Sequence, residues 1–249
     1  MYCSRQITYT IRQGDNLYQL ARYFQTTVPQ LLALNPAVDP YNLQVGSGLA
    51  ICPGEGFQMP DTCPNPPACP DASKQMGLVN DMRLAWSQHV YWTRMLLLSI
   101  AERLKDLDAV TQRLMRNPAD IAGIFARYYP PNVANAIAQL LTEHLEIGGK
   151  LITALRDGNS AQAEALNRQW YANADQMAAA FSSISPYYNQ QDMREMLYRH
   201  LDLTKQEVAM RLAGNYPADI NAFDAVEEEA LTMADTFSTG IMMQFPQMF

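Results

Sequence analysis

Cysteine is scarce in this chain and confined to one end: all four cysteines lie within residues 1–69, and residues 70–249 contain none. Long apolar runs are missing as well. No stretch approaches the roughly 18 apolar residues that a transmembrane helix needs, so we expect no membrane-spanning segment. The first residues show no basic segment followed by an apolar one, so no signal peptide is visible. We therefore expect a mature form, export by another route, or action inside a cell or spore.

Familiar catalytic motifs are also absent. The sequence has no Gly-x-Ser-x-Gly elbow, no P-loop and no glycine-rich dinucleotide fingerprint, which argues against the most recognisable hydrolase, nucleotidase and dehydrogenase sites. Charged residues make up only 17% of the chain, and the formal net charge is −7. Residues 1–52 carry three arginines and two aspartates, a net charge of +1, so residues 53–249 carry −8. We expect neither nucleic acid nor an anionic membrane as a partner of so acidic a body.

The first fifty residues have the pattern of a small α+β module. Apolar and polar residues alternate over residues 7–12, as in a half-buried strand. A turn signal at Gly14-Asp15 precedes a helix, which Asp15 or Asn16 can cap. A second short helix over about residues 28–34 ends at Asn35-Pro36, because proline disfavours helix in the residue before it. Residues 49–52 are typical of a closing strand.

The order of these residues, from Tyr9 to Ala21 and on through Asn35-Pro36, Asn42-Leu43 and Leu49-Cys52, resembles a LysM domain over about residues 6–53. The resemblance implies a strand–helix–helix–strand fold that binds N-acetylglucosamine polymers such as peptidoglycan or chitin. It places the glycan groove between the two strand–helix loops, at Gly14, Asp15, Asn16, Leu17, Asn35, Pro36, Tyr41, Asn42 and Leu43.

In that groove, backbone groups would read the acetamido group, and Leu17 or Tyr41 would contact the sugar face. The family usually has threonine where this chain has Asn16. The alternative is that Asp15 and Asn16 only cap a helix and that Leu43 only fills the core. Both can hold at once, since the caps also shape the groove.

Disulfides are the expected role of the cysteines. A core of about fifty residues is marginal and benefits from a covalent link. Cys3 precedes the first predicted strand and Cys52 ends the last, so adjacent antiparallel strands would bring them within reach. Cys63 and Cys69 can close a loop inside a segment with six prolines, typical of a semi-stiff spacer. A zinc site is disfavoured, because no CxxC pair is present. We predict a LysM domain at 1–53, a linker at 54–72 and a helical domain at 73–249.

The C-terminal body is predicted to be an all-α bundle of about six helices built from three helical-hairpin repeats. Its three histidines lie 55 and 56 residues apart, and each is followed by an Ala-Asp pair after 31, 31 and 35 residues. This period indicates three hairpins, each with a histidine-bearing helix and an aspartate-bearing one. The predicted helices cover about 76–104, 107–128, 132–156, 160–183, 189–213 and 217–243.

Three interpretations of the histidines compete. In the structural one, His89, His144 and His200 are buried and each bonds to an aspartate on a neighbouring helix. In the second, the histidines converge on iron, manganese or zinc, and carboxylates complete the ligand shell. The candidate carboxylates are Asp120, Asp175 and Asp235. The Glu-x-x-His signature of di-iron bundles is absent. In the third, a small-molecule pocket has aromatic walls: Trp86, Tyr91, Trp92, Trp170 and Tyr171.

The helical half is similar to an uncharacterised bundle in proteins of spore-forming Gram-positive bacteria, on the segments 86–94, 170–175 and 230–235. That resemblance implies no activity and favours a cell wall or spore envelope. We therefore predict a glycan-binding anchor, not an enzyme, that holds a helical domain of unknown task. The alternatives are a metal-binding helical domain with enzymatic activity at the wall, and a spore-coat scaffold. Such a scaffold would self-associate or bind a protein through the helical domain. The apolar end, residues 241–249, is expected to dock either on the bundle or on a partner.

Overall fold

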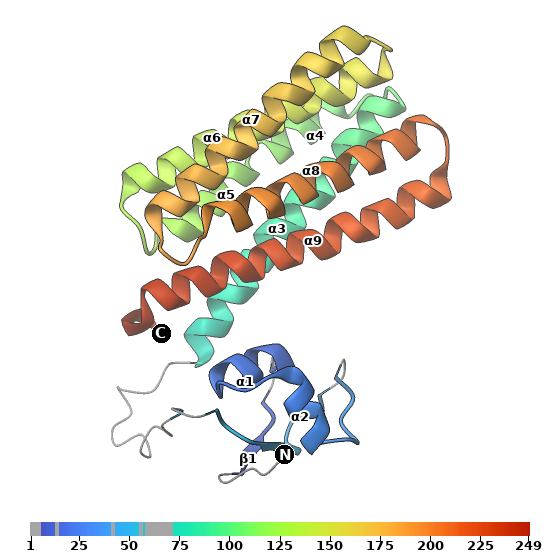
Figure 1. Cartoon of the computed structure of the whole chain (residues 1–249). Coiled ribbons are helices and arrows are strands. Elements are labelled where there is room, and N and C mark those ends of the chain that lie inside the picture. Colours follow the sequence, from blue (N-terminus) through green and yellow to red (C-terminus); the bar gives the residue numbers. More distant parts are fainter. Residues whose placement is uncertain (1–5, 13–14, 41–42, 55–56, 58–71) are drawn as a thin grey trace. The chain divides into compact units, whose positions relative to one another are not determined.

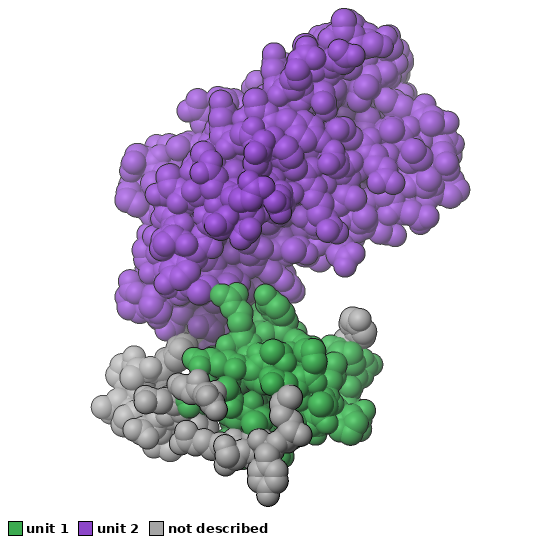
Figure 2. Space-filling model, viewed as in Figure 1, with its two compact units in different colours: residues 1–69 green, residues 70–249 purple. Residues whose placement is uncertain are grey.

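The protein consists of two compact units, residues 1–69 and residues 70–249 (Figure 2). The computed structural model describes residues 6–12, 15–40, 43–54, 57 and 72–249. Among the described helices, none combines the length and the apolar character needed to cross a membrane.

The N-terminal unit has two helices between two strands (Figure 1). The elements are β1 (Ile7–Thr10), α1 (Leu17–Tyr23), α2 (Val28–Leu34) and β2 (Gly48–Ile51). The strands pair antiparallel, with Ile7 opposite Ile51 and Thr10 opposite Gly48. This is the strand–helix–helix–strand order that the sequence predicted. One small core holds it together, formed by Ile11, Leu17, Leu20, Ala21, Phe24, Leu31, Leu49 and Ile51.

Helix caps explain where the two short helices begin. The Asn16 side chain accepts a hydrogen bond from the Gln19 backbone N–H at 2.9 Å, which caps α1. At the start of α2, Thr27 and Gln30 form a capping box, in which each side chain bonds to the other residue's backbone. These caps satisfy N–H groups that a helix start otherwise leaves without partners.

The described part of the C-terminal unit consists of helices joined by short connections (Figure 1). Its elements are α3 (Ala72–Ala101), α4 (Leu107–Leu114), α5 (Asn117–Phe125), α6 (Pro131–Arg156), α7 (Ser160–Ile184), α8 (Gln190–Leu212), α9 (Tyr216–Gln244) and a final 3-10 turn (Pro246–Met248). The five long helices form a closed arrangement: α3 packs on α9, α9 on α8, α8 on α7, α7 on α6, and α6 returns to α3.

The prediction of six helices in three hairpin repeats is wrong. Over residues 72–249 the structure has seven α-helices and one 3-10 turn, because the predicted helix 107–128 is divided into α4 and α5. Pro118 stands in the first turn of α5, where its missing N–H costs nothing, whereas inside a continuous helix it would remove a hydrogen bond. The first of the three predicted hairpins therefore does not have the form of the other two.

Aromatic rings fill the centre of the helical core. Phe237 stacks on Trp86 with 5.4 Å between ring centroids and lies 4.6 Å from Phe181. Tyr188 donates a hydrogen bond to the Phe237 carbonyl at 2.7 Å. It can do so only because residue 240 is glycine: a Cβ there would lie 2.0 Å from the Tyr188 ring. At the C-terminus, Phe249 is buried and stacks with Tyr128, so this apolar end packs on its own bundle.

Candidate functional site

The loops that should form the glycan groove begin side by side. The Ile11 N–H donates to the Ser47 carbonyl at 2.8 Å, and the Gly46 N–H donates to the Ile11 carbonyl at 2.8 Å. These bonds continue the two-stranded ladder past its last pair. The segment that leaves β1 is therefore held against the segment that enters β2.

Asp15 and Asn16 build the first loop. The Asp15 carboxylate accepts a hydrogen bond from the Arg12 backbone N–H at 2.7 Å. Burial, with a further contribution from a hydrogen bond to Asp15, raises the pKa of Tyr9 to about 12. Asn16, whose side chain is exposed, caps α1. The capping role considered in the sequence is therefore real for Asn16, while Asp15 closes the loop ahead of it.

Asn35 builds the second loop. Its side-chain amide donates to the carbonyls of Leu31 and Ala50, both at 2.7 Å, and its side-chain oxygen accepts from the Ala50 N–H at 2.8 Å. All of these partners are backbone groups of α2 and β2. The Asn35 side chain thus links the end of α2 to β2. Because both ends of its amide already bond to the backbone, its role is to position the loop.

The remaining predicted groove residues lie in different environments. Leu17 is 3% exposed and belongs to the core, so the expectation that its side chain contacts the sugar face is wrong. Leu43 is half-buried against the same core, and Pro36 is exposed. Gly14, Tyr41 and Asn42 lie outside the described residues.

Cys52 is disulfide-bonded, in accordance with the expected use of cysteine. Cys3, Cys63 and Cys69 lie outside the described residues, so the predicted pairing stays a prediction.

A second candidate site lies inside the helical unit, where its three histidines meet. His89 on α3, His144 on α6 and His200 on α8 are 2%, 4% and 4% exposed. Their ring centroids are 5.7–6.4 Å apart. One ring nitrogen from each histidine lies within 4.8 Å of the other two. Helices remote in sequence thus bring every imidazole of the chain to one place.

Two buried asparagines orient two of the rings. The His89 Nδ1 lies 2.9 Å from the Asn117 Oδ1, and the His144 Nδ1 lies 3.2 Å from the Asn173 Oδ1. Each asparagine donates its NH₂ group to a backbone carbonyl, of Ala85 and Leu140 respectively. This fixes the amide orientation, so the asparagine oxygen must face the ring and accept a hydrogen bond from the Nδ1–H group.

His200 differs from the other two. Its Nδ1 is buried and has no hydrogen-bond partner among the described residues. Burial lowers the pKa of His89 to about 4 and that of His144 to about 3, and it also lowers the pKa of His200. For His144 and His200 the neighbouring imidazoles lower the pKa further. The cluster is therefore neutral at neutral pH.

The predicted aspartate partners are elsewhere, which is a correction. Asp235 is part-exposed and pairs with Arg83 at 2.6 Å. Asp175 pairs with Arg194 at 2.8 Å and accepts a hydrogen bond from Tyr198. Asp120 is exposed. Charged carboxylates stay at the surface because burial would cost more than an imidazole hydrogen bond returns, whereas a neutral amide can be buried.

The sequence reasoning missed Asn117 and Asn173. The repeat itself contained the signal, because an asparagine stands just before the Ala-Asp pair in two of the three repeats. The segments are Asn-Pro-Ala-Asp and Asn-Ala-Asp. The third repeat has Thr232-Met233 in the corresponding place, and His200 accordingly has no such partner.

A small cavity of about 20 Å³ lies beside the three histidines. That volume holds one water-sized group and no larger molecule. Of the five aromatic residues proposed as walls of a ligand pocket, only Trp170 lines it. Trp86 stacks in the core, and the hydroxyls of Tyr91 and Tyr171 bond to the surface residues Glu227 and Asp202. The predicted small-molecule pocket with these walls is therefore not formed.

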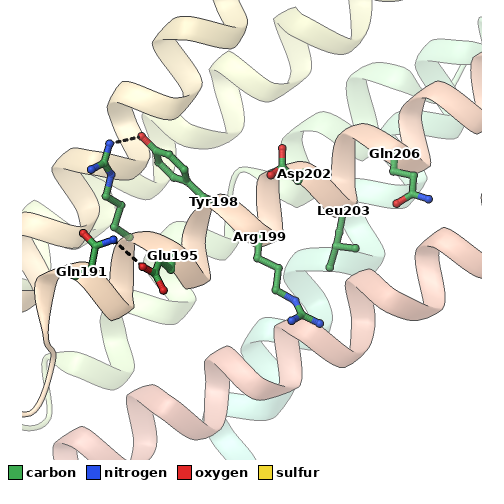
Figure 3. A pocket seen from close by; sticks show the side chains of 8 residues that line it. Gln191, Glu195, Tyr198, Arg199, Asp202, Leu203 and Gln206 are labelled. Atoms are coloured by element: carbon green, nitrogen blue, oxygen red, sulfur yellow. Dashed lines mark hydrogen bonds between the residues drawn. The ribbon is translucent and has the colours of Figure 1, made fainter.

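A larger groove of about 440 Å³ runs along the exposed face of α8 (Figure 3). Its polar side chains are engaged with neighbours: Arg194 bonds to Tyr198, Gln191 bonds to Glu195, and Arg199 pairs with Glu229. All its lining residues belong to this one helix. It has no converging buried polar group, so we do not assign it a ligand.

Comparison with protein families matches residues 9–51 to the LysM domain. LysM domains generally bind glycans that contain N-acetylglucosamine, and they are typically associated with cell walls. Comparisons of the chain with curated proteins and with solved structures gave no match.

Proposed function

We propose that residues 9–51 bind an N-acetylglucosamine-containing glycan of a cell wall or spore envelope and thereby anchor the helical unit there. The LysM match is the observation that carries this proposal. The strand–helix–helix–strand order supports it, as do the two adjacent loops.

The groove would lie between residues 12–16 and residues 35–47. In this proposal Asp15, Asn16 and Asn35 hold the loops in shape through the bonds described above. The glycan would then be contacted directly by backbone groups of the loops and by side chains that are not part of the core. Pro36, Tyr41 and Asn42 are the candidates, with Gly14 leaving room for the sugar.

A single module of this size binds weakly, and tight attachment usually needs several modules acting together. One match is present in this chain. We therefore expect retention on an insoluble polymer, which presents many sites, and weak binding to short soluble oligomers.

The test is co-sedimentation of the full chain with insoluble peptidoglycan and with chitin. Retention by either polymer is expected, and the preferred polymer identifies the glycan. Tyr41→Ala should reduce retention at least several-fold. Tyr23→Ala is the matched control, because Tyr23 is an exposed tyrosine of the same unit that lies at the end of α1, outside both loops. Sedimentation with neither polymer would contradict the proposal, and so would equal losses in the two variants.

The scaffold alternative concerns the helical unit and is tested separately. Light scattering of the full chain over a wide concentration range should show a constant mass if the bundle does not self-associate. A mass that rises with concentration would favour assembly through the bundle.

A further inference from the structure

We propose that His89, His144 and His200 form a metal site that binds one zinc-class divalent ion, with three imidazole ligands and a fourth position open to the adjoining cavity. The inference is independent of glycan binding, because it concerns only the helical unit. Three observations carry it: the convergence of the rings, the orientation that the asparagines impose, and the unpartnered nitrogen of His200.

The distances fit an ion after a small adjustment. The three ring nitrogens lie within 4.8 Å of one another. A point equidistant from three such atoms lies about 2.8 Å or less from each, against a Zn–N bond of about 2.0–2.1 Å. In a tetrahedral site with that bond length the ligand nitrogens are about 3.3 Å apart, so each ring must move inward by about 0.9 Å at most. Buried side chains held on three long helices can make such a shift through small side-chain rotations.

The asparagines set the tautomers of two of the rings. Because Asn117 and Asn173 accept from Nδ1, the neutral rings of His89 and His144 carry their lone pairs on Nε2. Histidines that bind metals characteristically donate their second ring N–H to an oxygen acceptor, which fixes the tautomer and the ring direction. Asn117 and Asn173 have that relation to the two histidines.

The unpartnered ring nitrogen of His200 is a second, independent observation that points to a bound ion. A buried polar atom without a partner is rare and needs an explanation. The His200 Nδ1 is such an atom, and His200 lines the same cavity as His89 and His144. A neutral imidazole always has one lone pair, and a cation between the rings would use it.

The donor set selects the metal. The ligands are three neutral nitrogens, and no carboxylate or thiolate of the described residues joins them. Magnesium and calcium prefer oxygen ligands, and non-haem iron sites usually include a carboxylate. Zinc accepts three histidines in a tetrahedral site whose fourth position is water. The cavity of about 20 Å³ has room for that water.

The ion would link α3, α6 and α8, which are remote in sequence. Metal binding to such a site adds directly to the stability of the fold, because the unfolded chain does not present the three ligands together. The enclosed fourth position admits a water-sized ligand, so we assign the ion a role in holding the bundle together.

The experiment uses the full chain, purified without a histidine tag or a metal-affinity column. Since the chain has only three histidines, every imidazole belongs to the cluster. After loading with Zn²⁺ and gel filtration, elemental analysis should find one equivalent of zinc. Loading with Co²⁺ as a probe should give the visible absorption of a tetrahedral site. X-ray absorption of the zinc form should show nitrogen and oxygen ligands with imidazole scattering.

Variants separate the ligands from their surroundings. His200→Gln should lose stoichiometric zinc, while its circular dichroism confirms the fold. Leu141→Ala is the matched control, because Leu141 is buried on α6 one turn before His144 and has no ligand atom. It should melt at a lower temperature and keep its zinc. Asn117→Ala should weaken zinc binding about 10–100-fold, as expected for a positioning residue.

Three results would overturn the proposal. The first is that the wild-type chain retains no zinc, and the second is that folded His200→Gln retains all of it. The third is a shell of sulfur ligands in the X-ray absorption spectrum, which would place the ion on the cysteines. The X-ray absorption spectrum is measured on the wild-type chain, so it tests the histidine ligands even if the variants do not fold.

Discussion

The two units of this protein use their polar side chains in opposite ways. In the N-terminal unit, Asp15, Asn16 and Asn35 bond to backbone groups and shape loops at the surface. In the helical unit, His89, His144 and their asparagine partners are buried and bond side chain to side chain. The first arrangement lies within residues 9–51 and is recognisable as a motif. The second depends on helices that meet only in the folded chain.

Lowering the pH should produce the largest difference in stability between the two units. The pKa of all three histidines is lowered by burial, so between pH 6.5 and about 4 the unfolded chain binds protons that the folded chain does not. Stability of the helical unit therefore falls as the pH falls below 6.5, by up to about 4 kcal/mol per pH unit for three histidines. The N-terminal unit has no histidine.

Urea unfolding of the metal-free chain at pH 7.0 and 5.5, followed by a probe for each unit, measures this difference. No loss of stability in the helical unit would show that the histidines are not buried in the neutral form.

Core truncation should be the next largest effect. Phe237→Ala removes a fully buried ring that contacts Trp86 and Phe181, at an expected cost of about 3–5 kcal/mol. Only the helical unit should lose stability, because the N-terminal core is separate. Two-probe unfolding checks this. An equal shift of both transitions would mean that the units unfold as one.

Gly240→Ala should destabilise the helical unit by about 1–3 kcal/mol, because the new Cβ would overlap the Tyr188 ring and force repacking. Gly123→Ala is the matched control. Gly123 lies within α5 and a Cβ there meets nothing within 4 Å, so alanine should stabilise the helix by about 0.5–1 kcal/mol. Thermal unfolding of both variants gives the comparison. Shifts of the same sign would be inconsistent with it.

The smallest expected effect is in the N-terminal unit. Asn16→Ala removes the cap of α1 and should cost about 1 kcal/mol. Asn16→Thr should be nearly neutral, because threonine can also cap, and it should keep glycan retention. The measurements are unfolding of this unit and co-sedimentation with the preferred polymer. If Asn16→Thr loses retention while its stability is unchanged, Asn16 contacts the sugar directly.

The helix boundaries show how far local sequence reaches. The predicted helices 132–156, 160–183 and 189–213 agree with α6, α7 and α8 within one residue at each end. Pro130-Pro131 and the Asp157-Gly158-Asn159 turn are strong local signals, and Gly158 has a positive φ of 71°. The division of 107–128 was missed, although Pro118 offered a similar signal.

Sequence alone determined the N-terminal module, because its caps, turns and strand pattern lie within about fifty residues and each acts on its neighbours. It also offered burial of the three histidines as one of three interpretations. Tertiary structure decided which groups they meet. The aspartates of the repeat lie at the surface with arginines, and Asn117 and Asn173 occupy the interior. The physical reason is desolvation: a charge remains near water, while a neutral amide can be buried once each of its groups has a partner.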